Sequence, residues 1–68
     1  MPEQLESRLE QLNDWCARTS GLPEFAYWRE QRMSALRSIA LYRPLSAVEY
    51  MNLGHQYPEA KRLAGEEN

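Results

Sequence analysis

Three features are scarce in this 68-residue chain, and each scarcity excludes a class of protein. The chain holds one cysteine, Cys16, so no disulfide can form within it. One cysteine and one histidine, His55, are too few for a closed zinc site built by a single chain. No apolar run approaches the ~18 residues that indicate a membrane-spanning helix. We therefore expect no metal, no cofactor and no membrane span.

Motifs that carry catalytic chemistry are missing as well. The sequence has no Gly-rich phosphate loop, no C-x-x-C pair and no nucleophile motif. A catalytic histidine needs a nucleophile to activate or a carboxylate to orient it, and we recognise no such arrangement around His55. We interpret His55 as a surface residue at a loop or helix end. Because so short a chain has little room for a cleft, we predict that the protein is not an enzyme.

A strong charge of either sign is also lacking, since ten acidic and eight basic residues give a net charge of −2. Such a weak field provides no general attraction to nucleic acid or to an anionic membrane. The composition, 43% apolar and 26% charged, is typical of a folded domain. The lone thiol and an acidic, amphipathic N-terminal segment unlike an export signal predict a cytoplasmic protein.

Small size makes stability a problem that the sequence must solve. A single domain of this length buries roughly 60% of its unfolded surface, and its core supplies only ~3–5 kcal/mol. Small domains usually add a disulfide, a metal or a second subunit, and the first two are excluded here. We therefore predict that the protein is a homodimer.

The first predicted helix spans residues 2–19. Its apolar residues recur at spacings of four, three and four, which indicates one buried seam. The seam residues are Leu5, Leu9, Leu12 and Cys16. The acidic residues fall on the opposite side, and we interpret them as a solvated face: Glu3, Glu6, Glu10 and Asp14. Gly21 then suits the left-handed position that follows a helix.

A second helix is predicted over residues 23–42. Pro23 suits the first helical position, and Pro44 forces the helix to stop before it. At about 20 residues, or ~30 Å, we expect it to be the longest and most central helix. Arg29 and Arg32 lie on or beside its apolar face, and two interpretations stay open. Their stems are buried with the charged heads in water, or they belong to a contact surface.

The strongest local signal opens a third helix, predicted over residues 47–54. Ser46 and Glu49 match a capping box, and Leu45 and Tyr50 occupy the positions of a hydrophobic staple. Gly54 either ends this helix or only weakens it. A fourth helical turn over residues 58–64 and a frayed tail over 65–68 complete the chain. The predicted fold is a small all-α, three-helix bundle, in which the third helix folds back across a hairpin of the first two.

Aromatic residues are numerous for so small a core: two Trp, four Tyr and one Phe. We expect Trp15, Phe25 and Trp28 to fill the core, which leaves tyrosines for an interface. We therefore predict a non-enzymatic protein-binding module that occupies a partner's surface. Small bacterial or phage inhibitors, anti-activators and adaptors act in this way. The predicted partner-binding residues are Tyr27, Trp28, Arg32, Leu41 and Tyr42.

The alternative is a small DNA-binding transcription regulator with a degenerate helix-turn-helix in residues 47–64. The match to that motif is poor, because Glu49 lies where a core apolar residue is expected and Tyr50 where a small one is. The second helix of the motif would carry only Lys61 and Arg62 as basic residues, whereas DNA-binding helices usually present a basic face. We therefore rank protein binding above nucleic-acid binding.

Overall fold

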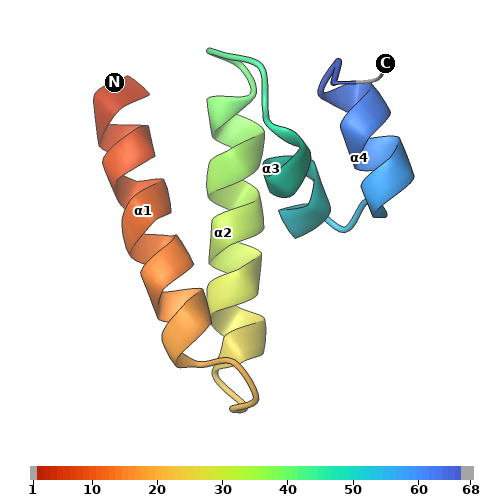
Figure 1. The fold of residues 1–68 in the computed structure, drawn as a ribbon. Coiled ribbons are helices and arrows are strands. Elements are labelled where there is room, and N and C mark those ends of the chain that lie inside the picture. Colours follow the sequence, from red (N-terminus) through yellow and green to blue (C-terminus); the bar gives the residue numbers. More distant parts are fainter. Residues whose placement is uncertain (1, 67–68) are drawn as a thin grey trace.

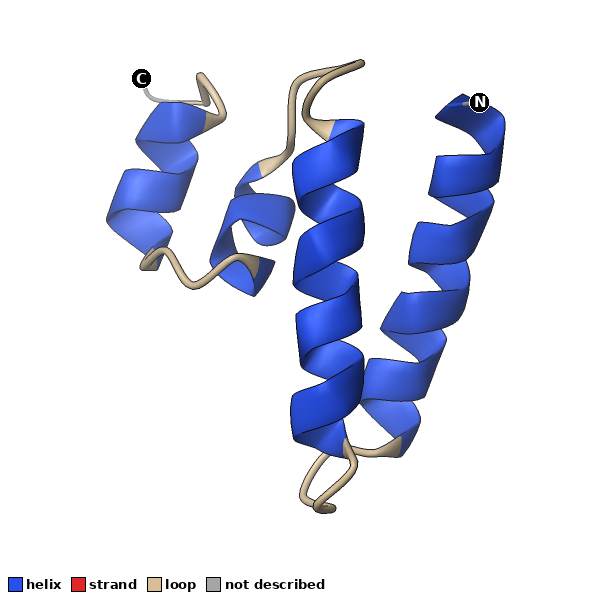
Figure 2. Cartoon of the chain, turned by 180° about the vertical axis from the view of Figure 1, so that it is seen from behind, coloured by secondary structure: helices blue, strands red, loops and turns tan. Residues whose placement is uncertain are grey.

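The computed structural model describes residues 2–66, and every regular element among them is a helix. In chain order these are α1 (Pro2–Arg18), α2 (Phe25–Ile39), α3 (Ala47–Asn52) and α4 (Tyr57–Leu63). Figure 1 shows α1 and α2 as one helical hairpin, with α3 and α4 as a shorter pair beside α2. The same arrangement is seen from behind in Figure 2. The predicted all-α class is confirmed.

The buried side of α1 is the seam predicted from its periodicity. Leu9, Leu12 and Cys16 are buried, and Leu5 is half-buried. Cys16 therefore serves as a small apolar core residue, as buried cysteine commonly does. Gly21 follows the helix with φ +83°, the left-handed conformation expected there.

Helix α2 differs from its prediction at both ends. It has 15 residues against 17 in α1, so the expectation that it is the longest helix is wrong. The backbone N–H of Phe25 donates to the carbonyl of Leu22, which makes residues 22–25 a turn ahead of the helix. Beyond Ile39 the chain tightens, because Leu41 and Tyr42 donate to carbonyls three residues earlier.

The local signals around α3 are all realised. The Ser46 hydroxyl accepts from the Glu49 N–H at 3.2 Å, and the Glu49 carboxylate accepts from the Ser46 N–H at 2.8 Å. The two staple residues, Leu45 and Tyr50, belong to the main apolar cluster. Gly54 does end the helix: its φ is +106°, and the next residue, His55, donates its N–H to the carbonyl of Tyr50.

The placement of α3 contradicts the prediction. It does not fold back across the α1–α2 hairpin but packs mainly against α4, with a small contact on α2. The reason is the turn at Gly54, which brings α4 back alongside α3. Each of these short helices buries one alanine, Ala47 in α3 and Ala60 in α4. Of the predicted 65–68 tail, residues 67 and 68 lie outside the described residues, whereas Gly65 and Glu66 close the end of α4 with backbone hydrogen bonds.

The molecule is flat, and folding buries little of its surface. Its extents are 37 × 29 × 14 Å, and its radius of gyration of 12.3 Å exceeds the value of about 10.9 Å for a compact chain of this length. The accessible surface is 4884 Å², against about 4450 Å² for a typical monomer of this mass. Among residues 2–66, three large side chains are fully buried: Leu12, Leu36 and Ile39. The α1–α2 hairpin and the α3–α4 pair are therefore joined by a thin core.

Candidate functional site

A row of aromatic side chains crosses the α1–α2 hairpin near its turn. Trp15 of α1 stacks on Trp28 of α2, with ring centroids 4.8 Å apart and planes 9° from parallel. The edge of Tyr27 meets Trp28 at 5.0 Å, and the guanidinium of Arg18 lies 5.7 Å from the Trp15 ring. We call these four residues, Arg18, Trp15, Trp28 and Tyr27, the aromatic row. Neighbouring stacked and edge-on rings hold one another in place, so the row is a preorganised surface.

The aromatic row is open to solvent. Trp15 is 41% exposed and Tyr27 is 59% exposed, while Trp28 between them is half-buried. The expectation that Trp15 helps to fill the core is therefore wrong. Trp15 directly precedes Cys16, and a step of one residue turns a side chain about 100° around a helix, away from the buried seam. Phe25, also expected in the core, is only half-buried.

The structure does not gather the five predicted partner-binding residues into one patch. Tyr27 and Trp28 lie in the aromatic row, near the start of α2. Leu41 and Tyr42 are exposed in the loop that follows α2, at its opposite end. Arg32 lines a pocket between α2 and α3. Sequence reasoning missed Trp15 and Arg18, because only the register of the two helices shows which residues of α1 meet Trp28.

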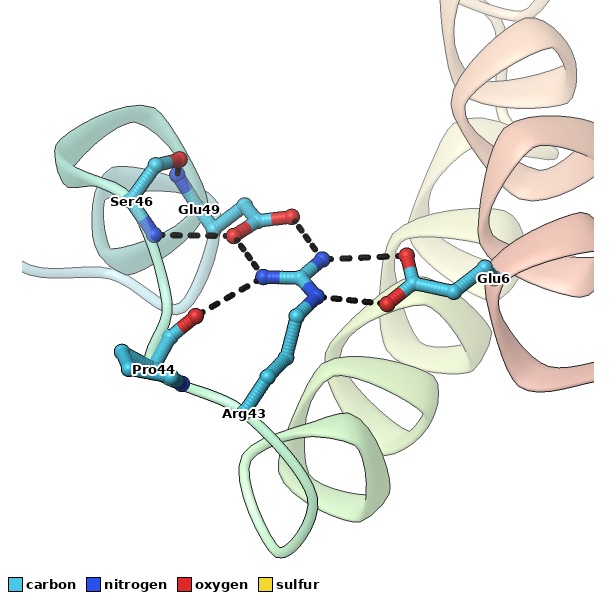
Figure 3. A network of polar contacts seen from close by, with 5 residues as sticks. All are labelled: Glu6, Arg43, Pro44, Ser46 and Glu49. Carbon is cyan, nitrogen blue, oxygen red and sulfur yellow. Dashed lines mark hydrogen bonds and ion pairs between the residues drawn. The ribbon is translucent and has the colours of Figure 1, made fainter. Parts of the chain in front are cut away.

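A polar network that sequence reasoning also missed joins three parts of the chain (Figure 3). Arg43, in the loop after α2, donates to the carboxylate of Glu6 in α1 and to that of Glu49 in α3. Its Nη1 also donates to the carbonyl of Pro44 at 2.9 Å. The two bonds to Glu49 measure 2.9 and 2.7 Å. All five N–H bonds of the guanidinium are thus used, which is the full capacity of an arginine.

The network changes the acidity of its members. Hydrogen bonds from Arg43 lower the pKa of Glu49 to about 2, and they also hold the pKa of Glu6 below its ordinary value. The two carboxylates, Glu49 foremost, raise the pKa of Arg43. Glu6 thus has an ionic partner that its position on α1 does not predict, although its side chain stays 44% exposed. The network is a structural tie between α1, the loop and α3, since Glu49 also caps α3.

His55 has a carboxylate partner that the sequence did not reveal. Its Nδ1 lies 2.7 Å from a carboxylate oxygen of Glu59, one turn into α4, and its ring meets Tyr50 edge-on at 5.8 Å. His55 is half-buried in the connection between α3 and α4. Over residues 2–66 there is no group of three His, Cys, Asp or Glu side chains that could hold a metal ion.

No family model, curated protein or solved structure matches this chain. Within the described part of the chain, the helices are too short and too polar for any of them to cross a membrane.

Proposed function

We propose that this protein is a non-enzymatic, cytoplasmic protein-binding module that uses the aromatic row to occupy a surface of a larger protein. The observation that carries the proposal is that the exposed rings of Trp15 and Tyr27 pack on either side of the half-buried Trp28 across the helical hairpin. Trp, Tyr and Arg are the residues most enriched at binding hot spots, where aromatic anchors enter pockets of the partner. The action is steric, as in a small inhibitor, anti-activator or adaptor. The lone thiol supports the cytoplasmic location.

The exposed Leu41 and Tyr42 supply a second contact in this proposal, at the other end of α2. A partner that spans the length of α2 would touch both the aromatic row and this loop. A helix of 15 residues is about 22 Å long, and a standard interface of about 800 Å² per partner covers such a distance.

Alanine substitutions in the two contacts should weaken partner binding. We expect Tyr27→Ala to weaken capture of the partner about tenfold or more, the loss typical of a hot-spot aromatic. Leu41→Ala should weaken it as well. Because Leu41 is 82% exposed in one chain, the melting temperature of this variant should not change in a dilute, monomeric sample. The measurement is a pull-down with tagged protein from the native host, read by mass spectrometry, followed by binding assays on the partner identified.

Tyr57→Ala is the matched control, because Tyr57 is exposed to nearly the same degree as Tyr27 but lies on α4, outside both contacts. It should bind like the parent protein. The proposal fails if Tyr27→Ala and Leu41→Ala bind the partner normally. A pull-down that yields DNA and no protein partner would instead favour the alternative, a DNA-binding regulator that uses α3 and α4.

We further propose that the protein forms a homodimer. Its accessible surface exceeds that of a typical monomer by about 430 Å², roughly half of what one partner buries in a standard interface. In the part of the chain that the structure describes, nine large apolar side chains are exposed, as many as the apolar side chains that form the core. A second copy of the chain that covered part of these side chains would remove their apolar surface from water, which favours association.

Sedimentation equilibrium at micromolar concentration tests the homodimer. We expect a molecular mass of twice the 8.0 kDa of one chain, falling toward one chain on dilution. The melting temperature should rise with protein concentration, because a partner that binds only the folded chain stabilises it by mass action. A folded species of one chain at all concentrations would contradict the homodimer and leave the partner-binding proposal standing.

A further inference from the structure

A pocket of 370 Å³ lies between α2 and the C-terminal end of α3. Its charged lining consists of two arginines, Arg29 and Arg32, and one carboxylate, Glu30. Met33 and Met51 give it an apolar wall, and Asn52 adds an amide. The formal charge of the lining is therefore positive. The volume falls in the range of pockets that bind small molecules, and the pocket does not include any member of the aromatic row.

Arg32 has an unusual environment in this pocket. Its Nε is buried and has no hydrogen-bond partner among the described residues. Leaving a buried donor unpaired destabilises the folded chain, and more so when the group is charged. Neither Arg29 nor Arg32 forms an ion pair within residues 2–66. Arg43, by contrast, has every N–H bonded and two carboxylates beside it.

The contrast with Arg43 indicates what Arg32 lacks. The Nε of Arg32 is buried, but its two Nη groups are not among the buried atoms, and they present N–H bonds in one plane, in a geometry that a carboxylate accepts with its two oxygens. The methionines beside it are flexible and polarisable, so they fit apolar groups of varied shape. We propose that this pocket binds a carboxylate carried on a small apolar group. Arg32 would bind the carboxylate directly, and Arg29 would be the second cation.

This site is separate from the proposed function, since its ligand would be held by α2 and α3 and not by the aromatic row. The carboxylate has two sources with the same chemistry: a free organic acid, or the carboxyl terminus of a polypeptide. Glu30 would oppose either ligand by charge repulsion. Its removal should therefore strengthen binding, and this effect would not be expected if the arginines had only a packing role.

The test is an NMR titration of the full, ¹⁵N-labelled chain, following the Nε–Hε signals of the arginines. Hexanoate should shift the Arg32 signal in a saturable way and bind more tightly than acetate, while the neutral hexanamide should not bind. N-acetyl-leucine, a mimic of a polypeptide terminus, distinguishes the sources: tighter binding than hexanoate supports a polypeptide, and equal or weaker binding supports a free acid. Inorganic phosphate binding more tightly than the carboxylates would overturn the proposal.

Variants complete the test. Arg32→Gln should weaken hexanoate binding about tenfold or more, since one charge-assisted, two-point contact is lost. Arg37→Gln, which changes an exposed arginine of α2 outside the pocket, should leave it unchanged. Glu30→Gln should tighten binding. If Arg32→Gln does not fold, Glu30→Gln and the titration of the unchanged chain still decide, and no saturable Arg32 shift in either would overturn the proposal.

Discussion

Arg43→Met is expected to lower the free energy of unfolding by about 2 kcal/mol, which is roughly half of what a core of this size supplies. Methionine keeps the stem of the side chain but removes all five N–H donors. The carboxylate of Glu49, only 16% exposed, would lose the cation that neutralises it, and the carbonyl of Pro44 would lose its donor. The melting temperature should fall by about 8–16 °C, measured by circular dichroism during heating.

Asp14→Asn is the control for this variant. It removes the Asp14–Arg18 ion pair, at 3.1 Å, in which both side chains are mostly exposed. Exposed pairs of this kind contribute between zero and about 1 kcal/mol. If Arg43→Met is no more destabilising than Asp14→Asn, the network is not the tie that its geometry indicates.

The pH dependence of unfolding tests whether the Arg43 network stabilises the fold through ionised carboxylates. Because the pKa of Glu49 falls from 4.5 in its ordinary state to about 2 in the folded chain, its stabilisation is fully present above pH 4.5. It is lost as the pH falls from 4.5 towards 2, and Glu6 acts in the same direction. Unfolding by urea across this range should show the parent chain losing stability, while Arg43→Met changes less.

The local structure of this protein could be predicted from short sequence patterns. The capping box at Ser46 and Glu49, the turn at Gly54 and the buried seam of α1 each depend on residues within one or two helical turns. The physical causes are local as well: an unpaired N–H at a helix start, a left-handed backbone position, and the 3.6-residue period. For this reason the all-α class followed directly from the sequence.

The packing of the helices could not be predicted in the same way. Arg43 and Glu6 are 37 positions apart in the chain, and no local rule selects Glu6 over the other carboxylates of α1. Which helix packs against α3 depends on Gly54, because a turn at this residue brings α4 back alongside α3, whereas a continued helix would not. Two residues of the aromatic row, Tyr27 and Trp28, are also among the partner-binding residues that the sequence predicts. Their neighbours Trp15 and Arg18 come from another helix, and only the hairpin register places them there.

Leu36→Ala is expected to be the most damaging of the substitutions considered, at about 3 kcal/mol. Leu36 is 0% exposed and belongs to the apolar cluster with Leu9, Ile39 and Leu45, which links α1, α2 and the start of α3. Removing most of the Leu36 side chain would leave a cavity among these neighbours, which can collapse into it only in part. The loss should appear as a lower midpoint of urea unfolding with an unchanged slope.

Leu41→Ala makes the same chemical change at an exposed position and is the matched control. In a dilute, monomeric sample it should leave the midpoint of urea unfolding unchanged, because the folded chain buries little of the Leu41 side chain. At concentrations where the homodimer forms, a Leu41 at the dimer contact would make the substitution costly, and the cost would grow with concentration. Leu36→Ala should cost the same at every concentration, because its contacts lie within one chain. Equal effects of the two substitutions in dilute samples would contradict the core described here.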